Sequence, residues 1–292
     1  MELRHLRYFV ILAEELHFAR AAEKLNISPP TLTVQIQEIE RTLSAQLLAR
    51  TKRSVTLTSA GEVFLIEARK VIKQFAVAEN VGRRAGRGEL GRIEIGYVGS
   101  AAYTGLLQTQ MSQFATDYPD VHMNAREFAM KTLPDLVANG EVDVGFVRLP
   151  MTIPPRLDYH VLIRDRFCLA LPTAQAQDEP LKDAIAPDEL STASFVLPEQ
   201  EFGTFQVASR GRFTPRIVSR PGSLLAVLTQ VSIGSGVAII PSALRTVVTL
   251  PQVAFHDISG EPIVSEIAAI FRSNEIAPAI LNFVAQIRKL EI

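Results

Sequence analysis

The sequence predicts an α/β protein with an all-α winged helix-turn-helix at the front, a long linker helix, and a larger two-lobed α/β body. Three observations lead to this fold class. Residues 18–40 indicate two helices around a tight turn. Residues 59–88 carry one apolar stripe without an interruption. Beyond Gly91 short strands alternate with helices, the pattern of sheets that helices cover on both faces.

The two helices of residues 18–40, FARAAEKLNISPPTLTVQIQEIE, are separated by Asn26-Ile27-Ser28. Ser28 can cap the second helix, and Pro29 is tolerated in a first helical turn. Apolar residues then recur at helical spacing and predict a buried stripe of Leu32, Ile36, Ile39 and Leu43. Two helices joined by a short turn form a helix-turn-helix, whose second helix enters the major groove of DNA. An ordinary helical hairpin in a core is the alternative.

The flanking segments complete a winged form of this motif. A first amphipathic helix is predicted from the spacing of Leu3, Leu6, Val10 and Ala13. Residues 47–61, LLARTKRSVTLTSAG, alternate apolar and polar positions and predict a short β-hairpin, or wing. The cations expected at the tip of the wing are Arg50, Lys52 and Arg53.

The linker helix of residues 59–88 begins at Ser59 and Glu62, which have the spacing of a capping box. Its stripe follows steps of four and three, as in a helix that pairs with a copy of itself. The stripe consists of Phe64, Ala68, Val71, Phe75 and Ala78. A core helix of the same domain is the alternative. Residues 82–91, GRRAGRGELG, predict a hinge behind it.

Charge is unevenly distributed over the 292 residues, although the net charge is only −1. Residues 1–91 hold 14 Lys and Arg against 10 Asp and Glu, whereas residues 92–292 hold 16 against 21. A basic front part on an acidic body is expected when only one part approaches phosphates. A single cysteine excludes an intramolecular disulfide and a cysteine zinc site. Without a secretory signal or an apolar run of membrane-spanning length, we expect a cytoplasmic protein without cofactor or membrane partner.

The body beyond Gly91 predicts two lobes with parallel sheets. A helix capped by Ser100 is expected to reach about Tyr118. A late strand near residues 261–271 and a final helix near 276–290 are expected to return to the first lobe. The other strands are predicted near residues 92–98, 121–128, 143–147, 159–162, 167–171, 194–197 and 236–240.

An enzyme and an exported solute-binding protein are the rival interpretations. Cys168 lies in an apolar run, where a buried inert thiol is favoured over a nucleophile. GSG at residues 234–236 is too short for a dinucleotide fingerprint and precedes its strand. A solute-binding protein would need a signal for export. The histidines do not have the spacing of metal ligands, and no nucleophile motif lies beside them. They are His5, His17, His122, His160 and His256.

Along essentially the whole chain the residues resemble the LysR-type transcriptional regulators. The segments that carry the resemblance are residues 3–28, 50–61, 91–103 (GRIEIGYVGSAAY) and 234–241 (GSGVAIIP), with Leu32, Gln35, Ile36 and Glu40 in the second helix. The resemblance implies a DNA-binding domain at 1–58, a dimerisation helix at 59–88, and a periplasmic-binding-protein-like effector domain at 89–292. Its lobes would comprise 91–161 with 268–292, and 162–267. It further implies a homodimer that assembles to a homotetramer, contact with RNA polymerase, and no catalysis. The opening residues are closest to the branch that controls aromatic-compound breakdown.

The DNA-facing side of the second helix departs from the family, because it has no cation at Val34. Guanine is bound best by Arg or Lys, adenine by amides and the thymine methyl by apolar groups. We therefore expect Thr33, Val34 and Gln37 to favour A·T pairs, while the wing cations contact phosphates or enter the minor groove. The remaining DNA-facing residues on this side are Ser28, Pro29, Pro30, Thr31 and Gln35.

A small anionic effector, an aromatic or dienoic acid, is expected between the lobes. Ser100 follows the first strand, at the edge where open α/β sheets bind ligands, and Ser223 opens a later helix. Either serine could equally be a simple helix cap. Arg148 could neutralise an acid or be a solvated surface charge. Phe128 stands where relatives often have a hydroxyl residue. The family pattern adds Ala101, Phe202, Gly203 and Thr204.

Overall fold

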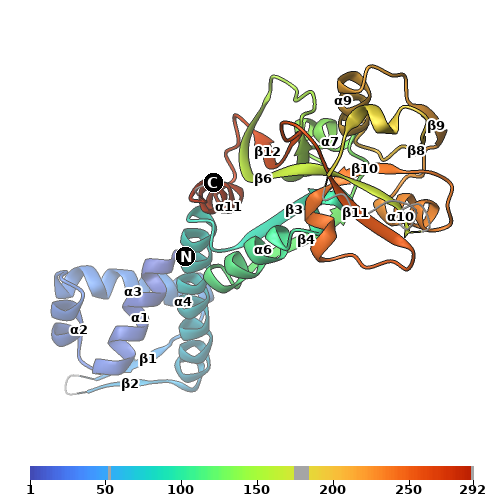
Figure 1. Ribbon diagram of the computed structural model, residues 1–292. Coiled ribbons are helices and arrows are strands. Elements are labelled where there is room, and N and C mark those ends of the chain that lie inside the picture. Colours follow the sequence, from blue (N-terminus) through green and yellow to red (C-terminus); the bar gives the residue numbers. More distant parts are fainter. Residues whose placement is uncertain (52–53, 174–183, 291–292) are drawn as a thin grey trace. The chain divides into compact units, whose positions relative to one another are not determined.

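The computed structural model describes residues 1–51, 54–173 and 184–290. The chain divides into two compact units, Met1–Arg84 and Ala85–Ile292 (Figure 1). Each unit has hydrophobic clusters of its own. In the described residues no helix is both long and apolar enough to cross a membrane.

The first unit is built from helices and one hairpin. Phe9, Leu32, Ile36 and Ile39 are at most 1 % exposed and form the centre of its core. The predicted helix-turn-helix is confirmed, but Leu43 is 37 % exposed and lies outside the buried stripe. Its elements are α1 (Leu3–Glu15), α2 (Phe18–Lys24), α3 (Pro29–Leu43), β1 (Leu48–Arg50), β2 (Val55–Leu57) and α4 (Ser59–Gly86).

The predicted wing is the antiparallel pair β1–β2, with Leu48 opposite Leu57. The cap of α4 differs from the prediction. The Thr58 hydroxyl, not Ser59, accepts a hydrogen bond from the Gly61 amide at 3.0 Å. A side chain at Gly61 would bring its Cβ within 2.0 Å of the Leu47 carbonyl oxygen, so the wing and the helix approach closely only because residue 61 is glycine. The helix continues to Gly86, through the first half of the predicted hinge.

The second unit is a mixed α/β structure in two lobes. Its first elements are β3 (Gly91–Tyr97), α5 (Gly99–Ala102), α6 (Leu106–Asp117), β4 (Val121–Glu127), α7 (Leu133–Asn139), β5 (Val144–Leu149) and β6 (Leu157–Pro172). The later elements are β7 (Ala184–Ile185), η1 (Pro187–Leu190), β8 (Ser194–Val196), α9 (Phe202–Arg210), β9 (Arg216–Ser219), α10 (Leu224–Ser232), β10 (Ala238–Pro241), η2 (Ser242–Thr246), β11 (Val253–Ile258), β12 (Val264–Arg272) and α11 (Pro278–Arg288).

The long strand β6 runs through both lobes (Figure 1). Up to Arg166 it pairs with β12, and from Phe167 it pairs with β10 and β11. Lobe I contains β3, β4, β5 and β12, around a core that includes Phe114, Phe146 and Phe283. Lobe II contains β7 to β11, with the β8–β9 pair as a small separate sheet.

Entirely parallel sheets were expected, and that prediction is wrong. The pairs β3–β4, β3–β5, β8–β9 and β7–β11 are parallel, whereas the pairs of β12 and β6 are antiparallel. The reason is that the chain returns from lobe II to lobe I, where β12 is inserted between β5 and β6. As predicted, it and α11 complete lobe I.

Three local predictions in this unit are also corrected. The strands expected at 159–162 and 167–171 are one strand, because the charged residues 164–166 continue β6 instead of ending it. Strands β7, β9 and β11 were missed. Ser100 does not cap a helix that reaches Tyr118: α5 begins at Gly99, and Gly105, with φ of +74°, ends that turn before α6 starts.

Candidate functional site

One face of α3 is exposed and uncharged in its first part, whereas the paired Glu38 and Arg41 lie further along it. The Ser28 hydroxyl accepts a hydrogen bond from the Thr31 amide at 3.2 Å, so the predicted cap is confirmed. Val34 is 58 % exposed, and Thr33 donates to the Pro29 carbonyl at 2.9 Å. The other predicted DNA-facing residues share this face or its margins, with Pro29, Pro30, Thr31 and Gln37 exposed and Gln35 half-buried.

Arg50 is an exposed residue whose side chain is tied back to α3 and α2 instead of projecting freely from the wing. Its guanidinium lies 2.7 Å from the Glu40 carboxylate and 5.2 Å from the centre of the Phe18 ring. Glu40 also accepts hydrogen bonds from the amides of Leu47 and Leu48, so the same carboxylate anchors β1 to α3. Lys52 and Arg53 lie outside the described residues.

The predicted dimerisation stripe of α4 is divided between two environments. Phe64 packs with its ring 5.1 Å from that of Phe9, and Ala68 is 1 % exposed, so both belong to the core of the first unit. Val71 is 48 % exposed and Phe75 40 %, although the Arg7 guanidinium lies over the Phe75 ring. Ala78 is exposed as well. The alternative of a core helix therefore holds for the first part of the stripe only.

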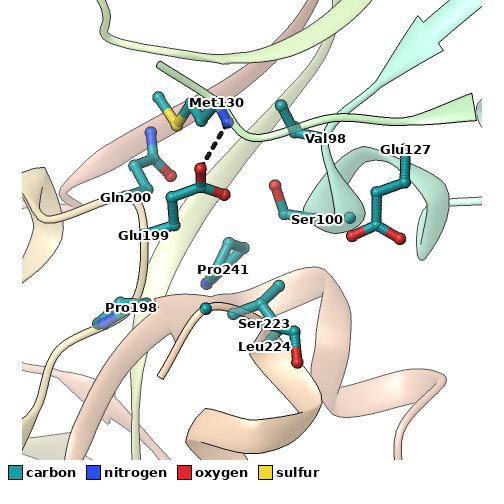
Figure 2. Close-up of a pocket in the computed structure, with 12 residues that line it drawn as sticks. Val98, Ser100, Glu127, Met130, Pro198, Glu199, Gln200, Ser223, Leu224 and Pro241 are labelled. Carbon is teal, nitrogen blue, oxygen red and sulfur yellow. Dashed lines mark hydrogen bonds between the residues drawn. The ribbon is translucent and has the colours of Figure 1, made fainter. Parts of the chain in front are cut away.

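A small cavity of about 30 Å³ lies between the lobes (Figure 2). It is lined from lobe I by Val98, Gly99, Ser100, Glu127 and Met130, and from lobe II by Pro198, Glu199, Gln200, Gly222, Ser223, Leu224 and Pro241. An adjoining cavity of about 500 Å³ shares three of these residues, which are Met130, Glu199 and Gln200. The predicted placement of Ser100 and Ser223 at one cleft is confirmed.

Two hydrogen bonds connect the lobes at the wall of this cavity. A carboxylate oxygen of Glu199 accepts from the Met130 amide at 2.5 Å, the contact drawn in Figure 2. The side-chain amide of the next residue, Gln200, donates to the Leu149 carbonyl at 3.1 Å. Partial burial raises the pKa of Glu199, the hydrogen bond from Met130 opposes that shift, and the charge of Glu127 adds to it. Adjacent residues of lobe II thus hold two separate segments of lobe I.

Arg148 is neither a free partner for an acid nor a surface charge. It is completely buried, and its guanidinium lies 3.0 Å from the Asp165 carboxylate. It also donates to the Ser265 hydroxyl at 2.9 Å and to the Ser100 carbonyl at 3.1 Å. Burial lowers its pKa, against the charge of Asp165. Because Asp165 in turn accepts from the Ser242 hydroxyl at 3.0 Å, this pair connects α5, β6 and η2.

The remaining predicted effector residues line this cavity only in part. The Ser223 hydroxyl accepts from the Ala226 amide at 3.3 Å and caps α10, as its alternative interpretation expected. Phe202 lines the larger adjoining cavity. The others serve packing: Ala101 and Gly203 are buried, Thr204 is buried with no hydrogen-bond partner for its hydroxyl, and Phe128 packs against the lobe I core under the Arg126 guanidinium.

Glu127, Met130, Glu199 and Gln200 were missed as site residues. The rule that located Ser100 would have found them, because Glu127 ends β4 and Glu199 closely follows β8. Cys168 is buried in β6, and burial raises the pKa of its thiol to about 12, as an inert thiol requires. Within the described ranges no group of acidic, histidine or cysteine side chains could hold a metal ion.

An exposed capped helix in a winged helix-turn-helix, followed by a two-lobed domain with a cavity between the lobes, defines a ligand-responsive DNA-binding protein. Comparisons with known proteins agree. Residues 3–62 match the family model of the bacterial regulatory helix-turn-helix proteins of the lysR family, and residues 86–291 match the LysR substrate binding domain. The chain belongs to the LysR family of DNA-binding transcriptional regulators, which are not enzymes.

Relatives match along nearly their whole length. The uncharacterized HTH-type transcriptional regulator YnfL of Escherichia coli K12 is 36% identical over 97% of this chain and 96% of its own. The Hca operon transcriptional activator HcaR of the same strain is 33% identical over 99% and 98%. The crystal structure of full-length CbnR in complex with its target DNA is 26% identical, with a TM-score of 0.81 over 99% of both chains.

Proposed function

We propose that this regulator senses a small effector between lobes I and II and converts its binding into altered DNA binding or bending, and thereby altered transcription. The observation that carries the proposal is the bridged cavity. Because Glu199 and Gln200 connect the lobes at its wall, an occupant changes the relative free energies of lobe arrangements. A ligand that prefers one arrangement shifts the population toward it.

The proposal assigns residues 1–58 to DNA binding, 59–88 to dimerisation and 89–292 to effector binding. Val71, Phe75 and Ala78 leave an apolar strip on α4 that a second copy of the same helix would cover. Two such dimers would assemble into the homotetramer. The two-fold symmetric assembly would then contact DNA and RNA polymerase. Two-fold pairing implies half-sites about one helical turn apart. Because its target is DNA, we place the protein in the cytoplasm.

The acidic effector expected from the sequence has weak support at this cavity. Its aromatic or dienoic body would suit the apolar walls of the adjoining cavity, which include Met151, Ile153 and Phe202. Its carboxylate, however, would meet Glu127 and Glu199, and Arg148 is already paired with Asp165. The chemical class of the effector is therefore argued separately below.

A binding-site selection with the full chain tests the DNA-reading part of this function. We expect A·T-rich half-sites about one helical turn apart, because the exposed face of α3 offers Thr33, Val34 and Gln37, and its cation Arg41 is paired with Glu38. The variant Val34→Arg should shift the preferred base toward guanine at one position of each half-site, a discrimination of about 1–3 kcal/mol. We expect this variant to change the selected base sequence more than it changes the salt dependence of DNA affinity.

Thr42→Arg is the matched control, since it adds the same charge at the other end of α3. It should leave the selected sequence unchanged and alter only the salt dependence. Val34→Arg with an unchanged preference would contradict the assignment of this face to base contacts. Failure of the unmodified chain to select any sequence would contradict the proposed function itself.

A further inference from the structure

Gln200 leaves an unpartnered acceptor at the cavity between the lobes. The side chain is 7 % exposed, and its Oε1 atom has no hydrogen-bond partner. The orientation of the amide is determined by its other end, because only the NH₂ group can donate to the Leu149 carbonyl. Gln200 lines both cavities, and Figure 2 shows its amide oxygen on the side of the Glu199 carboxylate. A ligand that donates hydrogen bonds would satisfy it.

Two carboxylates stand at the same cavity. One oxygen of Glu199 receives the Met130 amide, and in Figure 2 the other points into the space toward Ser100. Glu127 approaches from lobe I, with Oε1 2.6 Å from the position that a Cβ of Gly99 would occupy. The walls remove water from Glu199, and this raises the pKa of its carboxyl group, as does its acidic neighbour. A cation in this cavity would be attracted to both charges.

The adjoining larger cavity does not supply a compensating positive charge. Of the described residues that line the two cavities, Lys131 is the single cation. The acidic residues of the same lining outnumber it: they are Glu127, Asp135 and Glu199. A further acidic residue, Glu201, is paired with Arg220. The buried guanidinium of Arg148 is likewise used, by Asp165. The combined lining is therefore negative and rich in acceptors.

We propose that the effector carries a cationic amine, an ammonium or guanidinium group, on an apolar body. This inference rests on the proposed effector-sensing function and names the class of its ligand. The small cavity has room for an ammonium group, which is about as large as a water molecule. The apolar body extends into the cavity of about 500 Å³, along the walls that include Pro134, Met151 and Phe202.

In this arrangement the ammonium donates to Glu199 and Gln200 of lobe II, while Ser100 and Glu127 supply the acceptors that lobe I contributes to the lining. The lining thus offers acceptors from both lobes. The amine therefore binds best when the lobes are closed, and it stabilises the contacts of Glu199 with Met130 and of Gln200 with Leu149.

The test is a binding titration of the full chain by calorimetry with 2-phenylethylamine and benzylamine, against phenylacetate and 2-phenylethanol. We expect both amines to bind at least tenfold more tightly than the acid and the alcohol. Glu199→Gln keeps the acceptor for Met130 but removes the charge, and it should weaken amine binding at least tenfold. Glu261→Gln, an exposed carboxylate that does not line either cavity, is the matched control and should bind as the unmodified chain does.

Tighter binding of phenylacetate than of the amines would overturn the proposed cation and leave an effector-sensing regulator intact. Amine binding that Glu199→Gln leaves unchanged would place the ligand elsewhere and would also overturn it, as would the absence of amine binding. The unfolding midpoint of each variant without ligand shows whether a loss of binding reflects a loss of folding. DNA selection by the same chain tests the regulator independently of these results.

Discussion

Arg148 has the largest side chain among the completely buried residues that the structure describes. Its guanidinium contacts Asp165, the Ser265 hydroxyl and the Ser100 carbonyl, whereas its Nε atom has no partner. Removal of a buried charge from water is unfavourable, and only the complete set of partners compensates for it. The residue therefore positions α5 against β6, and its charge is not available to a ligand.

Replacement of Arg148 by leucine should lower the free energy of unfolding by about 3–5 kcal/mol, because Asp165 would remain buried without its cation. Arg164→Leu is the control on the same strand. The Arg164 side chain is 72% exposed and lies 3.4 Å from Glu266, so its loss should cost less than about 1 kcal/mol. Urea unfolding followed by circular dichroism measures both values. Equal, small losses would show that the buried pair contributes little.

At the scale of an element, α4 combines two roles along 28 residues. Ala68 faces the core of the first unit, while Val71 and Phe75 remain exposed one and two turns further on. Phe75→Asp should therefore dissociate the dimer without lowering the unfolding midpoint of the monomer. Gln74→Asp, an exposed neighbour with the same new charge, should do neither. Sedimentation velocity gives the assembly state, and a dimer that survives Phe75→Asp would contradict the proposed pairing.

Elements with a strong local signal could be predicted from the sequence. The helix-turn-helix, the wing and the first strand of lobe I each have a periodicity or a cap that acts within a few residues. The continuous strand β6 was not predictable in this way, because residues 164–166 are polar where β6 passes from one lobe to the other. The prediction of parallel pairing was wrong for a related reason. The chain returns from lobe II before it forms β12, so β12 pairs antiparallel with β5 and β6, and no local sequence pattern indicates this return.

The candidate site was predictable in position and not in chemistry. Ser100 and Ser223 indicated the correct cleft, because strand ends and helix starts meet there. The state of Arg148 depends on Asp165 and Ser265, which are distant in sequence, so the sequence could not show that its charge was compensated. The acidic lining was not predictable from the family resemblance, because the positions that carry the resemblance imply an acidic effector.

At the scale of the whole molecule, each of the two units contains its own apolar core, although α4 extends from one into the other. Units with independent cores unfold in separate transitions when the free energy of coupling between them is small. Differential scanning calorimetry of the full chain should therefore show two transitions. Ala68→Asp places a charge in the core of the first unit and should lower only that transition, by about 4–8 °C for each kcal/mol lost.

Arg148→Leu provides the reciprocal measurement. It should lower only the transition of the larger unit, by on the order of 10 °C, because each kcal/mol shifts a unit of this size by about 2–4 °C. An effector that binds between the lobes should raise the same transition and leave the other unchanged, since it contacts only residues of that unit. If either substitution moved both transitions together, the two cores would be coupled through α4. Effector binding could then alter the stability of the DNA-binding unit directly, in addition to its placement on DNA.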